Sequence, residues 1–224
     1  MGGRCPRVSA TLDRTIDRDI IVKYRSFVSS LGNASPGNRG DWMASEGVAT
    51  EIEAVRQDRF REAMALFATG VTVITTRSGE EPSGMTASAV CSLSLEPVQL
   101  LVCGSTHLPT HEALTRSGCF VVNVLGEGQG ALAKRFATPE IDRFAGLAVD
   151  EHDGLPLLRD AIAHFVCDVH ERIPGGDHSI FIGAVRALGT RPEARPLVYF
   201  QSAFGSLAKP ETALLESWLG DGGA

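Results

Sequence analysis

GMTASAVCSLSLEP, from Gly84 to Pro97, has small side chains where a buried strand normally carries bulky ones. Thr86–Ala89 and Ser92 leave the backbone of this predicted strand uncovered. A flat ligand can then lie against the main chain, where hydroxyl, N–H and C=O groups are free to bond its edge. The alternative is a strand packed tightly beneath a helix, where small residues only avoid a clash.

Short β-branched and apolar runs around this stretch predict further strands separated by Gly, Pro and Ser turns. The predicted strands cover residues 71–76, 85–92, 98–104, 120–125, 163–172, 179–188 and 197–200. The first two are expected to form a hairpin across SGEEPSG, and residues 110–116 and 129–136 have helical composition. Many short strands with few helices favour a mainly β antiparallel barrel with covering helices.

A helix is expected before the first strand. Thr50 and Glu53 form a capping box, and an apolar stripe runs from there to Gly70. The stripe consists of Ile52, Val55, Phe60, Ala63, Met64 and Phe67. We expect this helix to cover one mouth of the barrel.

The charge balance changes near residue 49, from +2 over residues 1–49 to −8 over the remaining 175. The sequence therefore predicts an N-terminal extension over 1–49, disordered or partly helical, with a Gly- and Ser-rich linker at 29–41. A globular domain over 50–208 and a tail over 209–224 with a short helix follow. An alternative is that the native protein begins at Met43.

The overall composition excludes several classes of protein. The chain is 43% hydrophobic and 21% charged with a net charge of −6, and lacks an apolar run of membrane-spanning length. We expect neither a membrane span nor nucleic-acid binding. The five cysteines form no CxxC pair and there is no secretory apolar core, which favours free thiols in a cytoplasmic protein.

Eight motifs in register resemble the flavin reductase family, the split-barrel proteins that supply reduced flavin to two-component monooxygenases. Besides the opening stretch they are FREAMALFATGVTVIT, LLVCGSTHLPTHEAL, FVVNVL, LAKRFA, DRFAG, GDHSIFIGAV and PLVYF. The resemblance extends from about Phe60 to Leu207. It implies an FMN-binding split barrel of Greek-key antiparallel strands, and a homodimer with flavin near the subunit boundary.

The resemblance also implies where the flavin binds. The ring-contacting residues would be Thr86, Ala87, Ser88, Ala89, Ser92 and Leu93. Cys103 is a further flavin-binding residue, and Ser105 would compensate for a missing serine on the phosphate side. Thr110, expected to cap the following helix, and Arg135 are the candidates for the flavin phosphate. The chain departs from the family at Leu108, where relatives usually carry Ser, and a solvated charge is the alternative for Arg135.

His178, in the GDH motif, would line the nicotinamide side of the flavin and position the substrate rather than act as an acid or base. A turn histidine bonded to Asp177 is the alternative. Asp142 and Arg143 are expected to hold a loop against the barrel. No metal site is expected, because Pro109 interrupts the i, i+4 spacing of His107 and His111.

The function that follows is an NAD(P)H:flavin oxidoreductase that reduces FMN or FAD and delivers reduced flavin to a partner monooxygenase. NADH is favoured over NADPH, because no basic cluster is evident for a 2′-phosphate. One alternative is an electron-carrying module that retains its FMN without nicotinamide turnover. A cobalamin- or metal-linked reductase on the same barrel is another.

Overall fold

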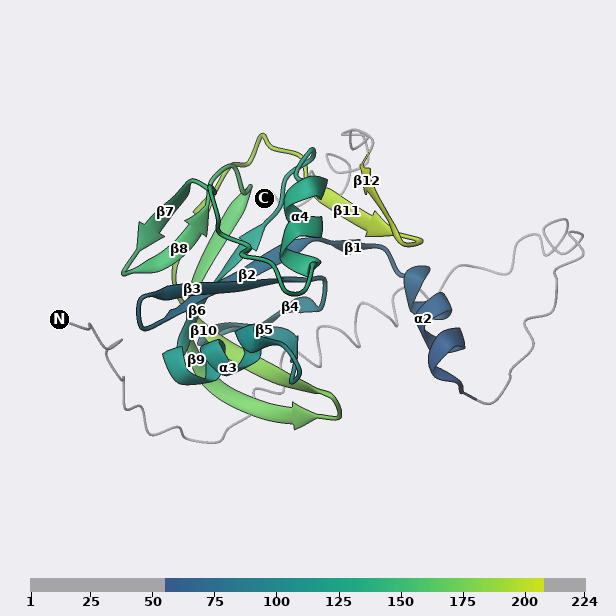
Figure 1. Cartoon of the computed structure of the whole chain (residues 1–224), viewed down its shortest axis with the longest axis horizontal. Coiled ribbons are helices and arrows are strands. Elements are labelled where there is room, and N and C mark those ends of the chain that lie inside the picture. Colours follow the sequence, from purple (N-terminus) through teal and green to yellow (C-terminus); the bar gives the residue numbers. More distant parts are fainter. Residues whose placement is uncertain (1–54, 208–224) are drawn as a thin grey trace, which may run out of the picture. The chain divides into compact units, whose positions relative to one another are not determined.

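The computed structural model describes residues 55–207 (Figure 1). The N-terminal extension, the Thr50–Glu53 capping box and the tail at 209–224 lie outside these residues. Within the described part, no helix is long and apolar enough to cross a membrane.

Seven strands form one antiparallel sheet in the order β3-β2-β6-β9-β10-β5-β4 (Figure 1). They are β2 Thr72–Ser78, β3 Glu81–Ala87, β4 Val90–Leu95, β5 Val98–Ser105, β6 Cys119–Val124, β9 Ala163–Gly175 and β10 His178–Thr190. A three-stranded sheet comprises β1 Thr69–Gly70, β11 Leu197–Phe200 and β12 Ala203–Ser206, and β7 Val149–His152 pairs with β8 Leu155–Leu158. The prediction of a mainly β, antiparallel fold is confirmed.

The large sheet curls on itself, because its two edge strands follow one another in the chain. β3 ends at Ala87 and β4 begins at Val90, although they lie at opposite edges of the sheet. Three Cα steps span at most about 11 Å, so the edges must come close together. β3 and β4 do not pair with each other, which leaves the split of the barrel open at residues 88 and 89.

The single strand predicted over residues 85–92 is wrong, because the chain changes from one sheet edge to the other at Ser88–Ala89. The predicted β2–β3 hairpin is confirmed, with Ser78 opposite Glu81. Strands β7, β8 and β12 were not predicted. They have four residues each and lie among Gly, Pro and Asp, where periodicity is too short to detect.

The interior of the curled sheet is apolar. Its main cluster includes Ile74, Leu100, Val102, Phe120 and Phe181, each at most 6% exposed. A second cluster lies beneath helix α4 (Gly130–Ala137), where Phe136 is 1% exposed. Burial of one such aromatic side chain stabilises the fold by about 1.5–3 kcal/mol. The sheet that carries the small residues of the opening stretch therefore packs on a well-filled apolar interior.

Helix α2 (Gln57–Ala65) has no buried side chain. Phe60, Met64 and Phe67 of the predicted stripe are 58%, 50% and 67% exposed. Within residues 55–207 these side chains are not buried against the barrel, so the expectation that they cover one of its mouths is wrong there. The helix also ends at Ala65 rather than at Gly70, because β1 begins at Thr69.

Candidate flavin site

The predicted ligand-binding residues lie at the split of the barrel. We call residues 86–93 the platform. Ser88, Ala89 and Ser92 are exposed, and the side chain of Leu93 is 45% exposed. The Val90 N–H donates to Ser88 O and the Cys103 N–H donates to Ala89 O, each at 3.0 Å. Within residues 55–207, no partner is found for the N–H groups of Ser88 and Ala89.

Such a surface fits the edge of a flat heterocycle. Small exposed side chains leave room for the ring, and two backbone donors are available on one turn of the chain. The alternative of a strand packed tightly under a helix applies only to the beginning of the platform. There Ala87 is 9% exposed and its carbonyl accepts a hydrogen bond from the Thr72 hydroxyl at 2.6 Å.

The platform is joined to helix α4 through Thr86. Its hydroxyl donates to Ala133 O at 2.6 Å, and Ala133 is fully buried. The donor capacity of Thr86 is thus used inside the protein, which the sequence did not indicate. We infer that Thr86 supports the platform, because its hydroxyl holds β3 against the helix that carries Arg135.

The carbonyl of Gly84 is the second anchor of β3. It accepts from the Thr110 hydroxyl at 3.0 Å and from Arg143 Nη1 at 2.7 Å. Ser83 Oγ in turn lies 3.1 Å from the Thr110 hydroxyl. A Cβ at Gly84 would lie 2.7 Å from Phe136 Cε1, so this close approach requires glycine.

Thr110 was predicted to cap helix α3 (Pro109–Ser117), and this is wrong. The N-cap is Leu108, whose side chain makes no capping hydrogen bond, and Pro109 occupies the first turn. The Thr110 side chain is fully buried against β3. A tertiary carbonyl acceptor has replaced the local one, and Thr110 as a whole is 0% exposed, so the predicted phosphate contact of its side chain is not available in this arrangement.

Arg135 and Arg143 lie on either side of one loop. Arg135 Nη2 donates to the carbonyls of Ala145 and, at 3.4 Å, Asp142. Arg143 Nε donates to Thr138 O at 3.1 Å. Asp142 Oδ1 accepts from the backbone N–H groups of Phe144 and Ala145 at 3.0 and 3.1 Å. The prediction that the loop is held against the barrel is confirmed for Arg143, which donates to Gly84 O of β3, whereas among residues 55–207 the Asp142 carboxylate bonds N–H groups of the loop itself. Burial lowers the pKa of Arg143 from its usual value.

Cys103, Ser105 and His178 follow the platform across two neighbouring strands. The backbone N–H of Cys103 on β5 donates a hydrogen bond to Ala89 O. Ser105 lies opposite His178 of β10 in the strand register. His178 Nδ1 lies 2.8 Å from Asp177 Oδ1, and this hydrogen bond holds the pKa of Asp177 below its usual value. The histidine side chain is 46% exposed. His178 therefore lies at the far end of a row of residues that begins at the platform and continues through Cys103 and Ser105.

His111 makes a contact that the sequence did not reveal. Its Nε2 lies 2.9 Å from Ser179 Oγ, and its ring packs edge-on against Phe181 with 5.3 Å between centroids. Burial, and secondarily the charge of Arg172, lower its pKa. Among the residues described, no group of three or more His, Cys, Asp or Glu is arranged to hold a metal ion.

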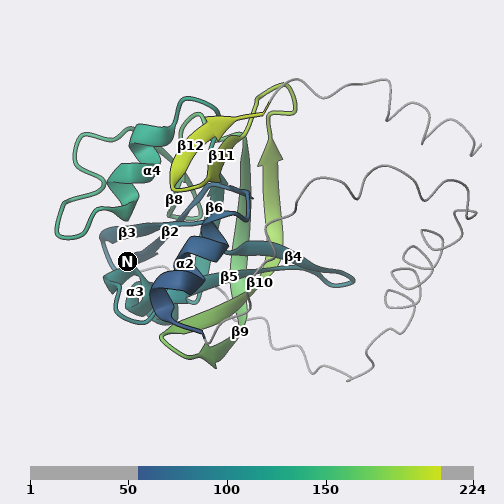
Figure 2. The same cartoon turned by 90° about the vertical axis from the view of Figure 1, so that its right-hand side faces the viewer.

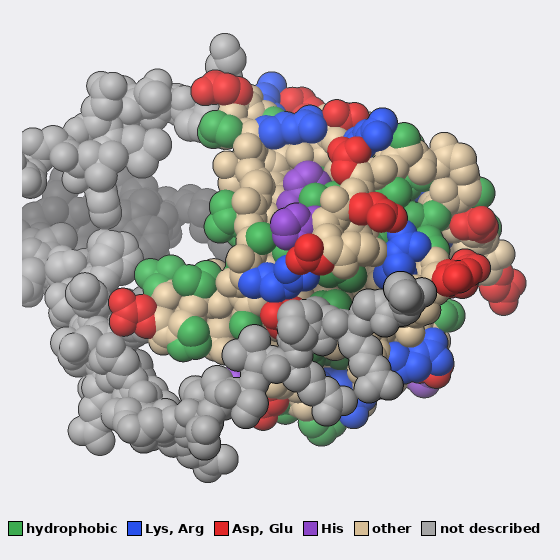
Figure 3. All heavy atoms as spheres, turned by 90° about the vertical axis from the view of Figure 1, so that its left-hand side faces the viewer, with side chains coloured by type: hydrophobic (Ala, Val, Ile, Leu, Met, Phe, Trp, Pro, Cys, Tyr) green, Lys and Arg blue, Asp and Glu red, His purple; other side chains and the backbone are tan. Residues whose placement is uncertain are grey.

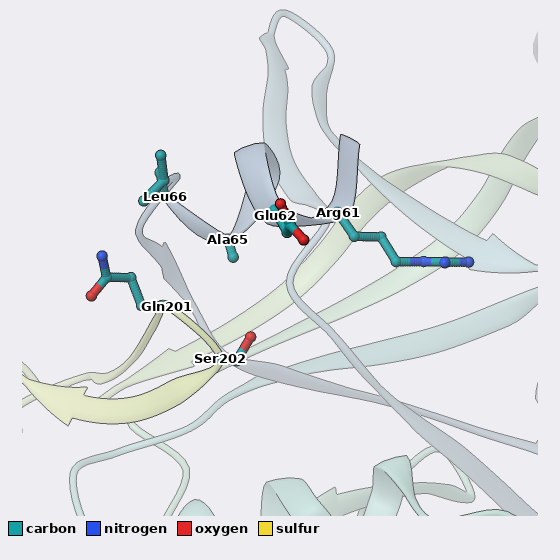
Figure 4. A pocket seen from close by; sticks show the side chains of 6 residues that line it. All are labelled: Arg61, Glu62, Ala65, Leu66, Gln201 and Ser202. Atoms are coloured by element: carbon teal, nitrogen blue, oxygen red, sulfur yellow. The ribbon is translucent and has the colours of Figure 1, made fainter. Parts of the chain in front are cut away.

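A separate groove of about 320 Å³ lies between α2 and the β11–β12 turn (Figure 4). Its lining residues are Arg61, Glu62, Ala65, Leu66, Gln201 and Ser202. None of them belongs to the platform. The site is therefore an exposed surface at the split of the barrel, distinct from this groove.

Comparison with known proteins shows the family of the chain. Residues 64–208 match the model of the flavin reductase like domain. The chain belongs to the flavin reductase family. The matched segment contains every predicted site residue of this flavin reductase, from Thr86 to His178.

Two curated relatives and one solved structure illustrate the similarity of this flavin reductase to known proteins. The reductase component of 4-hydroxyphenylacetate 3-monooxygenase from Thermus thermophilus is 40% identical over 69% of this chain and 99% of its own. The NADH-dependent flavin reductase StyB of Pseudomonas fluorescens is 41% identical over 70% and 92%. The NADH:FAD oxidoreductase SgcE6 of Streptomyces globisporus C-1027, solved with NAD and FAD fragments, has 34% identity, a TM-score of 0.67 and coverage of 71% and 99%.

Proposed function

We propose that the protein is an NADH-dependent flavin reductase that supplies reduced flavin to a partner monooxygenase. The platform is the observation that carries this proposal: exposed small residues at the open edge of the barrel, with backbone N–H groups at Ser88 and Ala89 that have no partner within residues 55–207. The names of its relatives agree, since they describe NADH-dependent flavin reductases and reductase components of monooxygenases.

When bound together, the two cofactors supply the hydride donor and the hydride acceptor of the reaction. The protein residues bind and orient them. The Ser88 and Ala89 N–H groups would bond the ring edge, with Ala87, Ser92, Leu93, Cys103 and Ser105 bordering it. His178, fixed by Asp177, would orient the nicotinamide from the β10 end of the row.

The groups that the platform offers to the ring are backbone N–H groups and small side chains, so binding of the ring would rest on neutral hydrogen bonds and surface contact. Each neutral hydrogen bond contributes only about 0.5–1.5 kcal/mol net. Moderate affinity suits a flavin that must leave for another protein. We therefore favour an exchangeable flavin, FMN or FAD, over a permanently held one.

The experiment is NADH oxidation by the purified protein, followed by near-ultraviolet absorbance with FMN, FAD or riboflavin as acceptor. Turnover that depends on added flavin supports the proposal, and the same assay with NADPH tests nicotinamide preference. Tightly copurifying FMN without oxidation of either nicotinamide would support the electron-carrier alternative. Turnover only with a corrinoid or metal acceptor would favour the remaining alternative.

We also propose a homodimer. Apolar side chains remain exposed on and just after α2, where Phe60 and Phe67 are more than half exposed, and on the β4–β5 hairpin, where Leu95 is 79% exposed. This hairpin extends away from the other strands (Figure 2), and Figure 3 shows hydrophobic side chains gathered on a projecting part of the surface. Exposed apolar surface of this kind marks a contact with another chain.

Light scattering on the intact protein tests the dimer. The wild type should have twice the mass of one chain, and Phe60→Ser together with Phe67→Ser should weaken the association. A monomeric wild type at micromolar concentration would contradict the proposal.

We place the protein in a reducing compartment such as the cytoplasm, because Cys91 and Cys103 carry free thiols.

A further inference from the structure

Helix α3 contacts the strand that carries His178 through a histidine that has no part in the proposed function. His111 Nε2 lies 2.9 Å from Ser179 Oγ, and the His111 ring packs edge-on against Phe181 with 5.3 Å between centroids. Ser179 is 4% exposed and Phe181 is 1% exposed. His111 therefore binds the buried side of β10, at the residue that directly follows His178.

The burial of Ser179 makes this hydrogen bond important. Within residues 55–207, His111 is the partner found for the Ser179 hydroxyl. A buried hydroxyl that loses its partner is costly, because no water replaces that partner. The bond between α3 and β10 is therefore a specific attachment and not an incidental surface contact.

His111 is suited to this bond by its own surroundings. Its carbonyl accepts from the Thr115 hydroxyl at 2.9 Å, and Arg172 Nη1 of β9 donates to the same hydroxyl at 3.3 Å. Burial and, secondarily, the charge of Arg172 lower the pKa of His111, which favours the neutral imidazole. A neutral imidazole carries one donor and one acceptor, so it can bond a hydroxyl in either tautomer.

His178, by contrast, has few restraints of its own. It is the first residue of β10, its side chain is 46% exposed, and its Nδ1 lies 2.8 Å from the exposed carboxylate of Asp177. Successive side chains of a strand point to opposite faces, so Ser179 is buried where His178 is exposed. The position of His178 therefore depends on what holds the backbone of its neighbours.

Both neighbours of His178 are held by residues at the beginning of α3 or just before it. Thr106 donates to Asp177 O through its backbone N–H and its hydroxyl, each at 3.0 Å. His111 bonds Ser179 on the other side. The GDH turn is thus attached to the same segment of chain before and after the histidine.

We propose that His111 is a positioning residue for the nicotinamide: through Ser179 it holds His178 in the orientation that receives NADH. The inference rests on the proposed function, in which His178 orients the nicotinamide. Among the described residues, the contacts of His111 are to Leu108, Thr115, Ser179 and Phe181. None of them belongs to the platform, so flavin binding should not depend on His111.

Two substitutions at residue 111 separate hydrogen bonding from packing. His111→Leu keeps an apolar contact with Phe181 but removes the bond to Ser179, whereas His111→Gln keeps an amide that can bond the hydroxyl. At saturating flavin, His111→Leu should lower kcat/KM for NADH about 2- to 10-fold, the loss of one hydrogen bond. His111→Gln should stay within about twofold of the wild type. The Kd of FMN, measured by fluorescence quenching without NADH, should change less than about twofold in both variants.

His164→Leu is the matched control. His164 is also half-buried and its Nε2 lies 2.9 Å from Leu158 O, but it is in register with Gly189, at the opposite end of β10 from His178. This control should leave kcat/KM for NADH within about twofold of the wild type. A loss as large as that of His111→Leu would show that removal of any such histidine has the same effect, and would overturn the inference.

The route through His178 is tested by a double substitution. When His178→Ala is already present, His111→Leu should cause no further loss of kcat/KM for NADH, because the residue that it positions is absent. A further loss would overturn the inference, as would an unchanged kcat/KM in His111→Leu alone or an equal weakening of FMN binding. If His111→Leu fails to fold, Ser179→Ala removes the same bond and should give the same results.

Hydrogen exchange of the intact protein, followed by mass spectrometry, tests the attachment without turnover. His111→Leu should exchange faster than the wild type at residues 176–181 but not at residues 86–93. Unchanged exchange at residues 176–181 would refute the attachment. If the wild type does not oxidise NADH and this difference is still observed, the catalytic proposal is refuted and the hold of His111 on His178 stands.

Discussion

Replacement of Gly84 by alanine tests whether the platform depends on close contact between β3 and helix α4. A Cβ at this position would lie 2.7 Å from Phe136 Cε1 and 3.1 Å from Ile74 O. Favourable carbon contacts begin at about 3.5 Å, so the ring must move by about 0.8 Å. Phe136 is only 1% exposed and packs edge-on against Phe144, so it has little room to move.

Overpacking of this kind costs about 1–3 kcal/mol. The lower entropy of the unfolded alanine chain returns about 0.4–1 kcal/mol. We therefore expect Gly84→Ala to be destabilised by about 0–2.6 kcal/mol, with a central value of about 1.3 kcal/mol, which corresponds to a Tm lower by up to roughly 10 °C for a domain of this size. The Kd of FMN should also rise, because the Gly84 carbonyl anchors β3 to Thr110 and Arg143.

Urea unfolding followed by far-ultraviolet circular dichroism gives the change in the free energy of unfolding. Gly189→Ala in β10 is the matched control, since a Cβ there would meet no atom within 4 Å. The control should be neutral or slightly more stable than the wild type. If Gly84→Ala is as stable as this control, the close packing of β3 on α4 is wrong.

Three further results follow from the structure. Ala89→Phe should raise the Kd of FMN at least about 10-fold without loss of stability, because residue 89 is exposed; unchanged flavin titration would count against the platform. Thr86→Val removes the hydrogen bond from the Thr86 hydroxyl to the Ala133 carbonyl and should cost about 0.5–1.5 kcal/mol in urea unfolding, whereas a neutral effect would show that this bond is not needed. Burial raises the pKa of Cys167 to about 12, so mass spectrometry should find exposed Cys91 alkylated first at mildly alkaline pH and Cys167 only after unfolding; the reverse order would contradict the strand arrangement.

The sequence predicts most of the strands because their patterns are local. Leu197–Phe200 matches β11 at both ends, and the β2–β3 hairpin follows from its turn residues. The break at Ser88–Ala89 could not be predicted, because small residues suit a continuous strand equally well. Only the sheet order reveals that the chain changes edges there.

The sequence predicts those parts of the site that depend on local composition. It does not predict those parts in which a side chain binds a partner that is distant in the sequence. The exposure of Ser88 and Ala89 agrees with a platform of small residues. Thr110, by contrast, precedes a helical run as a capping residue would, but its hydroxyl binds the distant Gly84 carbonyl.

The most direct test of the proposed site is a crystal structure of the protein soaked with FMN. The flavin ring should lie against residues 86–93, with its edge within hydrogen-bond distance of the Ser88 or Ala89 N–H. A ring bound elsewhere, or a platform filled by the side chains of the protein at saturating FMN, would contradict the central claim.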